Sequence, residues 1–250
     1  MGPCKIEIIE LKLLIMYKTI FLICVVLSAA ILLSFALNTK HNSTGKPGEK
    51  AGWKSLFNGK DLTGWRTYQN KPQDSWEVVN GQLHCKKEGA TKHCDIVTMD
   101  QYENFILELD WKIDKAANSG IIYRADENHD APYESGPEYQ LIDDAGYPEK
   151  LEDWQKSGSD YAMHPPSKLV SKPTGEYNHT RIVVNGAHVE HWLNGQKVVE
   201  FEFWTPEWQK LKSESKWKDE AGYGMVKKGH IDLQDHGGGV WFKNIRLKVL

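Results

Sequence analysis

Four polar side chains near the C-terminus alternate along one short stretch of the chain. They are His230, Asp232, Gln234 and His236. On a β-strand this spacing puts all four on one face and turns Ile231 and Leu233 toward the other, apolar face. Imidazole, carboxylate and amide groups side by side can hold a polar ligand and transfer protons. We therefore expect the floor of a binding site or an edge strand with a solvated face; for His236, just before three glycines, capping a turn is the alternative.

Two other stretches also carry polar groups with strand spacing. Glu138 and Gln140 share one face, and Arg124 is expected on the face opposite Tyr123. A guanidinium is a rigid two-pronged donor for an oxyanion, and a carboxyl with a pKa near neutrality can move a proton. If the three polar faces converge, they form one site. The structural alternative is an exposed Arg124–Glu138 ion pair, which adds little stability.

Further candidates lie outside these strands. Aromatic and imidazole side chains of the long irregular segment 145–174 are expected to wall the cleft. They are Trp154, Tyr161 and His164. The pair Asp143-Asp144 is expected either to form an acidic turn or to bind a divalent cation.

The composition narrows the class of function. The chain has 250 residues and a formal net charge of -3, so it offers no electrostatic footprint for nucleic acid. Its 10 Trp and 10 Tyr either fill a core or provide flat platforms for sugar rings. No nucleophile elbow, phosphate loop, HExxH or dinucleotide fingerprint occurs.

The N-terminal part differs from the rest of the chain. Residues 1–37 end in an uncharged apolar run from Ile20 to Leu37, which is typical of a signal peptide or a single membrane anchor. Residues 38–52 form a polar linker rich in Gly and Lys. We therefore expect an exported protein, in the periplasm or at the cell surface, whose folded domain spans residues 53–250.

From Trp53 onward, short alternating segments are separated by turn signals. Asn-Gly pairs at 80–81, 185–186 and 194–195 predict tight hairpins. The glycines at 237–239 are expected to turn the chain tightly into a closing strand. Many short strands and almost no helix predict an all-β fold, a two-sheet antiparallel sandwich with one concave outer face.

Two local features complete the expected fold. One helix is expected over Pro206–Lys218, with an apolar stripe that includes Trp208. Cys85 and Cys94 are expected either to bridge a hairpin or to remain free thiols.

Five motifs in combination resemble the 3-keto-disaccharide hydrolase domain family, over about residues 52–250. They are SLFNGKDLTGW (55–65), SGIIYR (119–124), EYQLIDD (138–144), HWLNG (191–195) and GHIDLQDHG (229–237). The family implies a concanavalin-like jelly roll, export in bacteria, and action on 3-keto sugars by hydrolysis or by a lyase reaction. The usual form of the last motif has a small residue where this chain has Asp232.

The implied chemistry gives the candidate residues their roles. A ketone at C3 acidifies the C2 hydrogen, so a base can remove it, and the C1 substituent then leaves; later addition of water gives net hydrolysis. This needs a base, a positive group at the enolate oxygen and an acid for the leaving oxygen. The expected catalytic residues are the base, Glu138 or His236, and Arg124 at the oxyanion, with or without a divalent cation. The expected substrate-binding residues are Tyr123, Gln140, Trp154, His230, Asp232 and Gln234.

Two functions without catalysis remain open. A lectin-like module at the cell surface would bind glycan through aromatic and amide groups and would need no base with a shifted pKa. A cell-surface interaction domain would bind no sugar at all. Turnover of a 3-keto-glycoside separates the enzyme from both.

Overall fold

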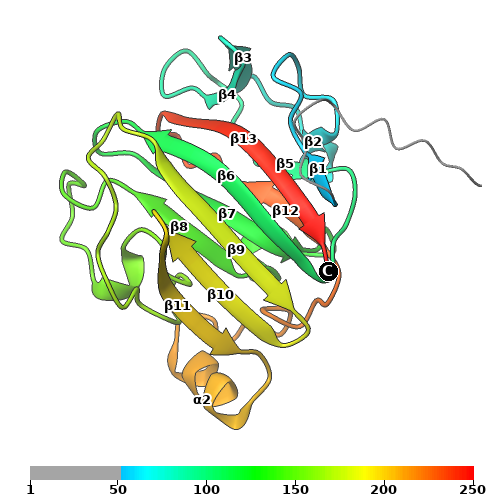
Figure 1. The fold of residues 1–250 in the computed structure, drawn as a ribbon, viewed down its shortest axis with the longest axis vertical. Helices are drawn as coiled ribbons and strands as arrows, with labels where there is room; N and C mark the ends of the chain where they lie inside the picture. The colour runs from blue at the N-terminus through cyan, green and yellow to red at the C-terminus, as the bar shows by residue number, and fades with distance from the viewer. Residues whose placement is uncertain (1–51) are drawn as a thin grey trace, which may run out of the picture. The chain divides into compact units, whose positions relative to one another are not determined.

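A computed structural model describes residues 52–250 of the chain (Figure 1). The expected signal or anchor segment at 1–37 and nearly all of the linker at 38–52 lie outside the described residues. Within the described part, none of the helices has the length and apolar character needed to cross a membrane.

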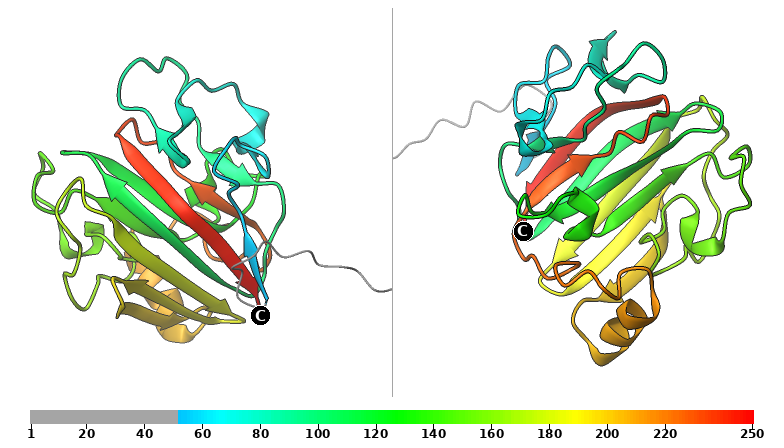
Figure 2. Two further views of the ribbon diagram at one scale, coloured as in Figure 1. Left: turned by 45° about the horizontal axis from the view of Figure 1, so that its top comes forward. Right: turned by 180° about the vertical axis from the view of Figure 1, so that it is seen from behind.

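The described residues form two antiparallel sheets that lie face to face (Figures 1 and 2), which confirms the predicted all-β jelly-roll sandwich. Sheet A has the order β11-β10-β9-β6-β13-β4-β3, with β1 paired to β13. Its strands are β1 (Trp53–Ser55), β3 (Trp76–Val79), β4 (Gln82–Cys85), β6 (Phe105–Ile113), β9 (Asn178–Asn185), β10 (His188–Leu193), β11 (Gln196–Glu202) and β13 (Val240–Val249).

Sheet B has the order β2-β5-β12-β7-β8. Its strands are β2 (Trp65–Thr67), β5 (Ile96–Thr98), β7 (Asn118–Ala125), β8 (Glu138–Ile142) and β12 (His230–Leu233). The connections carry the short helices η1 (Tyr68–Asn70), η2 (Pro132–Glu134), η3 (Asp153–Gln155) and α2 (Pro206–Glu214).

The Asn-Gly signals form the expected hairpins. Asn80 and Gly81 have φ of 51° and 75° between β3 and β4, and Asn194 and Gly195 have φ of 50° and 80° between β10 and β11. Positive φ at both central residues matches the twist of the flanking strands. The hairpins therefore fix the register of β3 on β4 and of the first pairs of β10 on β11 beside the turn, before a bulge at His191 and Trp192 shifts it.

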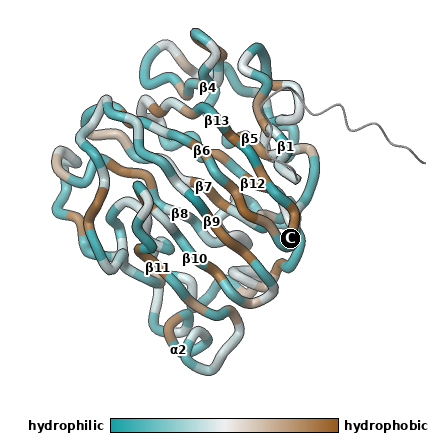
Figure 3. The backbone as a smooth tube through the Cα atoms, in the orientation of Figure 1, coloured by the Kyte–Doolittle hydropathy of each residue, from teal (hydrophilic) through white to brown (hydrophobic). Residues whose placement is uncertain are grey.

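The two sheets differ in how their outer faces are covered. Strand β10 of sheet A alternates strictly between buried and partly exposed residues, as expected for a sheet with one solvated face. In contrast, all residues of β8 and β12 in sheet B are buried. Figure 3 shows hydrophobic stretches along the strands and mostly hydrophilic loops around them. Sheet B thus has an apolar inner face in the core and a second buried face that is largely polar.

The glycines at 237–239 do not make the predicted hairpin turn. β12 belongs to sheet B and β13 to sheet A, so this stretch carries the chain from one layer to the other. A Cβ at Gly238 would lie 2.7 Å from the Cβ of Ala117. The chain therefore passes so close to the start of β7 that only glycine fits there.

The expected helix is present but shorter than predicted. Helix α2 ends at Glu214, and the Thr205 hydroxyl caps its first turn by accepting the Trp208 N–H at 3.2 Å. Trp208 is buried, as the apolar stripe predicts. Cys85 and Cys94 are both buried free thiols, so of the two alternatives the disulfide is wrong.

Candidate active site

The outer face of sheet B gathers the polar residues of β8 and β12. Ile122 of β7 pairs with Glu138 on one side and with Asp232 on the other. Two residues further along the strands, on the same face, Gly120 pairs with Gln140. The carbonyl of Gly120 also accepts the N–H of Gln234 at 3.0 Å. Paired residues in adjacent strands point to the same face. The predicted convergence of these two strands is therefore found in the structure.

A third carboxyl, which the sequence reasoning missed, belongs to the same face. Asp95 directly precedes β5, whose Ile96 lies in the core between the sheets. Alternation then turns Asp95 to the outer face, next to β12. We call the set Asp95, Asp232, Glu138, Gln140 and Gln234 the acidic face. Only the pairing of β5 with β12 reveals Asp95, because its own sequence surroundings carry no site signal.

Gly120 makes room for Glu138. A Cβ at this glycine would clash with the Glu138 carboxyl, so the Glu138 side chain lies across the bare backbone of β7. Beside it, the Gln140 amide donates to Asn118 Oδ1 at 2.8 Å. The Glu138 side chain therefore occupies the space over Gly120, where β7 has no side chain of its own.

Burial is the main cause that raises the pKa of all three carboxyls, and neighbouring negative charges add to it. Burial raises the pKa of Glu138 to about 8, and the charges of Asp95 and Asp160 add to this. Burial also raises the pKa of Asp95 to about 7. The pKa of Asp232 is well above its ordinary value because the group is buried and faces Asp95 and Glu138. At neutral pH the cluster therefore retains protons, which is typical of acid–base sites.

Asp232 and Gln234 have unpaired oxygens. Both carboxyl oxygens of Asp232 and the Oε1 of Gln234 are buried without a hydrogen-bond partner in the described part of the chain. Buried polar groups in folded proteins nearly always have partners, and exceptions occur at functional sites. These oxygens are also of the type that suits a divalent cation, whose binding stays a prediction.

Lys216 is the cation whose charge acts on Glu138. Its Nζ lies 4.3 Å from the ring centroids of both Tyr161 and Trp217 and 6.0 Å from that of Tyr133. Its charge lowers the pKa of Glu138 against the larger effect of burial. Trp154 packs edge-to-face on Tyr161 with centroids 5.3 Å apart, so Trp154 lies in this aromatic group, as expected for a wall of the site. Figure 2 (right) shows sheet B from the side of its outer face.

His230 lies at the end of the same face. Its Nδ1 is 2.6 Å from the Thr98 carbonyl, and its Nε2 is 3.1 Å from the Gln101 amide nitrogen. The carbonyl fixes the proton on Nδ1, so Nε2 accepts from Gln101. Glu127, which forms a two-pronged ion pair with Arg66, lies 3.8 Å from Nε2. His230 is thus held in a neighbouring network rather than among the three carboxyls.

Arg124 is not beside Glu138, so its predicted location is wrong. A bulge between β7 and β12 gives Arg124 a φ of 56° and turns its side chain away from the acidic face. The guanidinium donates to the carbonyls of Glu103, at 2.8 Å, and Gly186, at 2.9 Å, and lies over the Phe203 ring. Alternation of side chains could not reveal this, because a bulge breaks the alternation.

Two other predicted site residues also lie elsewhere. Tyr123 is buried between the sheets, where its hydroxyl is 3.0 Å from His191 Nε2. Strand β12 ends at Leu233, and the exposed His236 follows it rather than extending its polar face. The neighbouring Asp235 accepts the backbone N–H of Gly237 at 3.0 Å, which bends the chain at this point.

The remaining candidates organise loops. Asp143 Oδ1 accepts the N–H of Gly146 at 2.9 Å, and Asp144 Oδ1 accepts that of Ser157 at 2.9 Å. The acidic pair therefore holds the turn after β8. His164 Nδ1 is 2.8 Å from the buried Asp160, and its ring stacks on Phe201. His164 therefore does not belong to the aromatic group around Lys216.

A comparison with protein families gives the assignment. The family described as the 3-keto-alpha-glucoside-1,2-lyase-like domain matches residues 52–248. The chain belongs to this family. The predicted resemblance is thereby confirmed, and the acidic face lies in the part of the chain that the family covers.

Relatives of this lyase-like family agree with that assignment. A 3-keto-disaccharide hydrolase of Bacteroides thetaiotaomicron is 33% identical over 233 residues, which cover 82% of this chain and 80% of the relative. A crystal structure of a candidate glycosyl hydrolase from Parabacteroides distasonis has 40% identity and a TM-score of 0.75, and the match covers 80% of this chain and 94% of that one. A Bacillus subtilis protein with a galectin-like fold, 14% identical with a TM-score of 0.51, matches in fold alone over 78% of this chain and 94% of its own. The first two relatives support a carbohydrate-active enzyme.

The location of Arg124 predicts that its replacement will affect stability. In Arg124→Met the carbonyls of Glu103 and Gly186 lose a buried charged donor, so unfolding free energy should fall by on the order of 2–4 kcal/mol. Urea unfolding measures this loss. Arg181→Met, on the solvated face of sheet A, is the control and should change it by less than about 1 kcal/mol. Equal stabilities of the two variants would contradict the structural role.

The raised pKa of Glu138 predicts a pH-dependent stability. The folded protein keeps a proton up to a pKa of about 8 that the unfolded chain releases near 4.5, so unfolding free energy should fall as the pH rises between these values. Glu138→Gln removes this contribution and should be the more stable protein at pH 8, by roughly 1–3 kcal/mol. Urea unfolding from pH 5 to 8 tests this, with the exposed Glu207→Gln as control. A wild-type slope in Glu138→Gln would count against a buried neutral carboxyl.

Proposed function

We propose that this chain cleaves 3-keto-glycosides by removing the C2 proton and expelling the C1 substituent. The observation that carries the proposal is the cluster of three carboxyls on one face of sheet B, the buried Glu138 and Asp232 and the partly buried Asp95, with Asp95 near a pKa of 7 and Glu138 near 8. Elimination needs a base and an acid at once, and two carboxyls whose pKa values lie near neutrality provide both, one ionised and one protonated.

The proposed reaction proceeds in two proton transfers. The ionised member of the Asp95–Glu138 pair takes the C2 proton, and the electrons of that bond move to the C3 oxygen as an enolate. The protonated member then gives its proton to the C1 oxygen as that bond breaks, leaving an enone. Water added at C1, with a proton returned to C2, gives net hydrolysis; release of the enone gives a lyase.

Neutral Asp232 and cationic Lys216 supply the electrostatics that Arg124 was expected to provide. A carboxylic acid kept protonated by burial can donate a hydrogen bond to an enolate oxygen. The ammonium of Lys216 faces Glu138 from the rim and favours negative charge there. Gln140 and Gln234 offer amides to sugar hydroxyls, and the partly exposed rings of Trp154 and Tyr161 offer stacking surfaces for a sugar ring.

Asp95→Asn and Glu138→Gln should each lower kcat on a 3-keto-glucoside by about 10²–10⁴-fold, because each removes one proton carrier. Mass spectrometry and NMR of the products in D₂O follow the reaction. Elimination and readdition introduce deuterium at C2, whereas direct displacement at C1 does not. Glu108→Gln, on the outer face of sheet A, is the control and should retain activity.

Three results would reject the proposal. Full activity in Glu138→Gln would show that Glu138 is not part of the acid–base pair. Products without deuterium at C2 would show that the C2 proton is not removed. Binding of an unoxidised glycan without turnover of its 3-keto form would favour the lectin-like module instead.

The ammonium of Lys216 predicts a shifted pH profile. It lowers the pKa of Glu138, so Lys216→Met should raise that pKa further and move the corresponding limb of the kcat/KM–pH curve upward by about one unit. Methionine keeps the packing on Tyr161 and Trp217. Lys218→Met, from the same segment, should leave the curve unchanged. A uniform loss of rate without a shift would mean that Lys216 acts on substrate binding alone.

The location of this activity is a separate proposal. We propose that the apolar run from Ile20 to Leu37 exports the domain to the periplasm or the cell surface. Fractionation of cells that produce the full chain tests this.

A further inference from the structure

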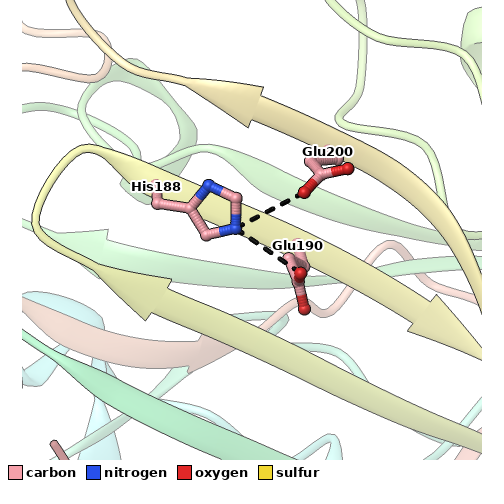
Figure 4. Close-up of side chains that lie close together, drawn as sticks. All are labelled: His188, Glu190 and Glu200. Atoms are coloured by element: carbon pink, nitrogen blue, oxygen red, sulfur yellow. Dashed lines mark ion pairs between the residues drawn. The ribbon is translucent and has the colours of Figure 1, made fainter.

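A second cluster of ligand-type side chains lies on sheet A, on the hairpin of β10 and β11 (Figure 4). His188 and Glu190 are two residues apart on β10 and share its outer face. The strand register pairs His188 with Glu202 and Glu190 with Glu200. We call these four side chains the His188 quartet. They form a rectangle across two neighbouring strands.

The spacing of three atoms in the His188 quartet is that of a metal coordination shell. His188 Nε2 lies 3.5 Å from Glu190 Oε1 and 3.6 Å from Glu200 Oε1. The three ligand atoms all lie within 4.8 Å of one another. A tetrahedral cation with bonds of about 2.1 Å to nitrogen and oxygen separates neighbouring ligand atoms by about 3.4 Å. Both distances are longer than those of a typical hydrogen bond and close to this edge length.

The fourth member orients the imidazole. Glu202 Oε1 is 2.6 Å from His188 Nδ1 and accepts a hydrogen bond from the Nδ1–H group. This bond keeps the proton on Nδ1 and turns the free electron pair of Nε2 toward the two other carboxylates, as Figure 4 shows for the ring. Metal-binding histidines commonly have such a carboxylate on their second nitrogen.

The charges of the His188 quartet are incompletely balanced. Glu190 and Glu200 face each other directly across the strands, an arrangement in which like charges repel. Lys197 lies 3.3 Å from Glu190 Oε1 and 2.7 Å from Glu200 Oε2 and neutralises one charge. Three carboxylates against one ammonium leave a surplus of two negative charges when the imidazole is neutral. Trp192 Nε1 donates to Glu190 Oε2 at 2.7 Å and holds that carboxylate in place.

We propose that His188, Glu190 and Glu200 bind one divalent transition-metal cation of the zinc class, with Glu202 as the partner of the imidazole and water in the open position. His, Glu and Glu form a ligand set that suits zinc. The cation would tie the edge strand β11 to β10. Its site is on the outer face of sheet A, whereas the acidic face is on sheet B, so the bound metal stabilises the fold and takes no part in the proposed reaction.

Two cations compete with the metal for this site. One is the ammonium of Lys197, whose side chain is 34% exposed and can turn into solvent. The other is a proton, because Nε2 of His188 can coordinate a cation only while it carries no proton. Metal binding must therefore release a proton and weaken as the pH falls. Removing Lys197 should strengthen it.

Titration of the purified protein with Zn²⁺ and with Co²⁺ at pH 7.5 tests the site, by calorimetry and by the visible absorption of Co²⁺. Three variants are compared with wild type: His188→Ala, Lys197→Met and, as control, His179→Ala. His179 lies on the same sheet face and pairs with Asp110 at 2.7 Å. It forms no three-ligand cluster among residues 52–250.

His188→Ala should lose one binding event and the absorption bands of tetrahedral Co²⁺. Lys197→Met should bind the metal at least about tenfold more tightly, because a competing positive charge is removed. His179→Ala should bind the metal as wild type does. Saturating Zn²⁺ should raise the Tm of wild type and not that of His188→Ala. Equal binding by wild type and His188→Ala, or weaker binding by Lys197→Met, would overturn the proposal. These readouts do not depend on turnover, so they stand or fall separately from the proposed activity.

Discussion

Two buried carboxyl groups, Glu138 and Asp232, and the partly buried Asp95 share one face of sheet B, and the rest of the structure must accommodate them. An ionised carboxylate without a partner is very unfavourable in such a place, so the groups retain protons instead. Glu138 and Asp95 titrate near 8 and 7 for this reason. The fold therefore stabilises a set of acids whose protons can move at neutral pH. A hydrophobic residue in place of Asp232 would relieve the cost of burying that carboxyl and remove the hydrogen bond proposed for the enolate oxygen.

Two features of the backbone position acids of the acidic face. Gly120 leaves room on β7 for the Glu138 side chain, and the backbone N–H of Asp235 donates to Asp95 Oδ1 at 2.7 Å. Sheet A supplies the opposite wall of the core through residues such as Trp111 and Leu109. Because the inner face of sheet B is fixed by this core, its outer face is fixed as well. The two outer faces differ: that of sheet A is exposed to solvent, and that of sheet B carries the acidic face next to aromatic residues.

Much of the fold followed from local patterns. Alternation and Asn-Gly turns predicted the hairpins of β3 with β4 and of β10 with β11, because both depend on neighbours within a few residues. The same alternation put Glu138 with Gln140, and Asp232 with Gln234, on single faces. It failed at Arg124 and at His236, because a bulge and the end of a strand interrupt the two-residue period.

The sequence by itself determined the type of fold, the family and the faces of individual strands, since these depend on short-range periodicity and on motifs. Only the tertiary structure decided which faces meet. Asp95 joins Asp232 through the pairing of β5 with β12, and Lys216 reaches Glu138 from a segment almost 80 residues away in the chain. The raised pKa values also belong to the tertiary structure, because burial and proximity to other charges exist only once distant strands have packed together.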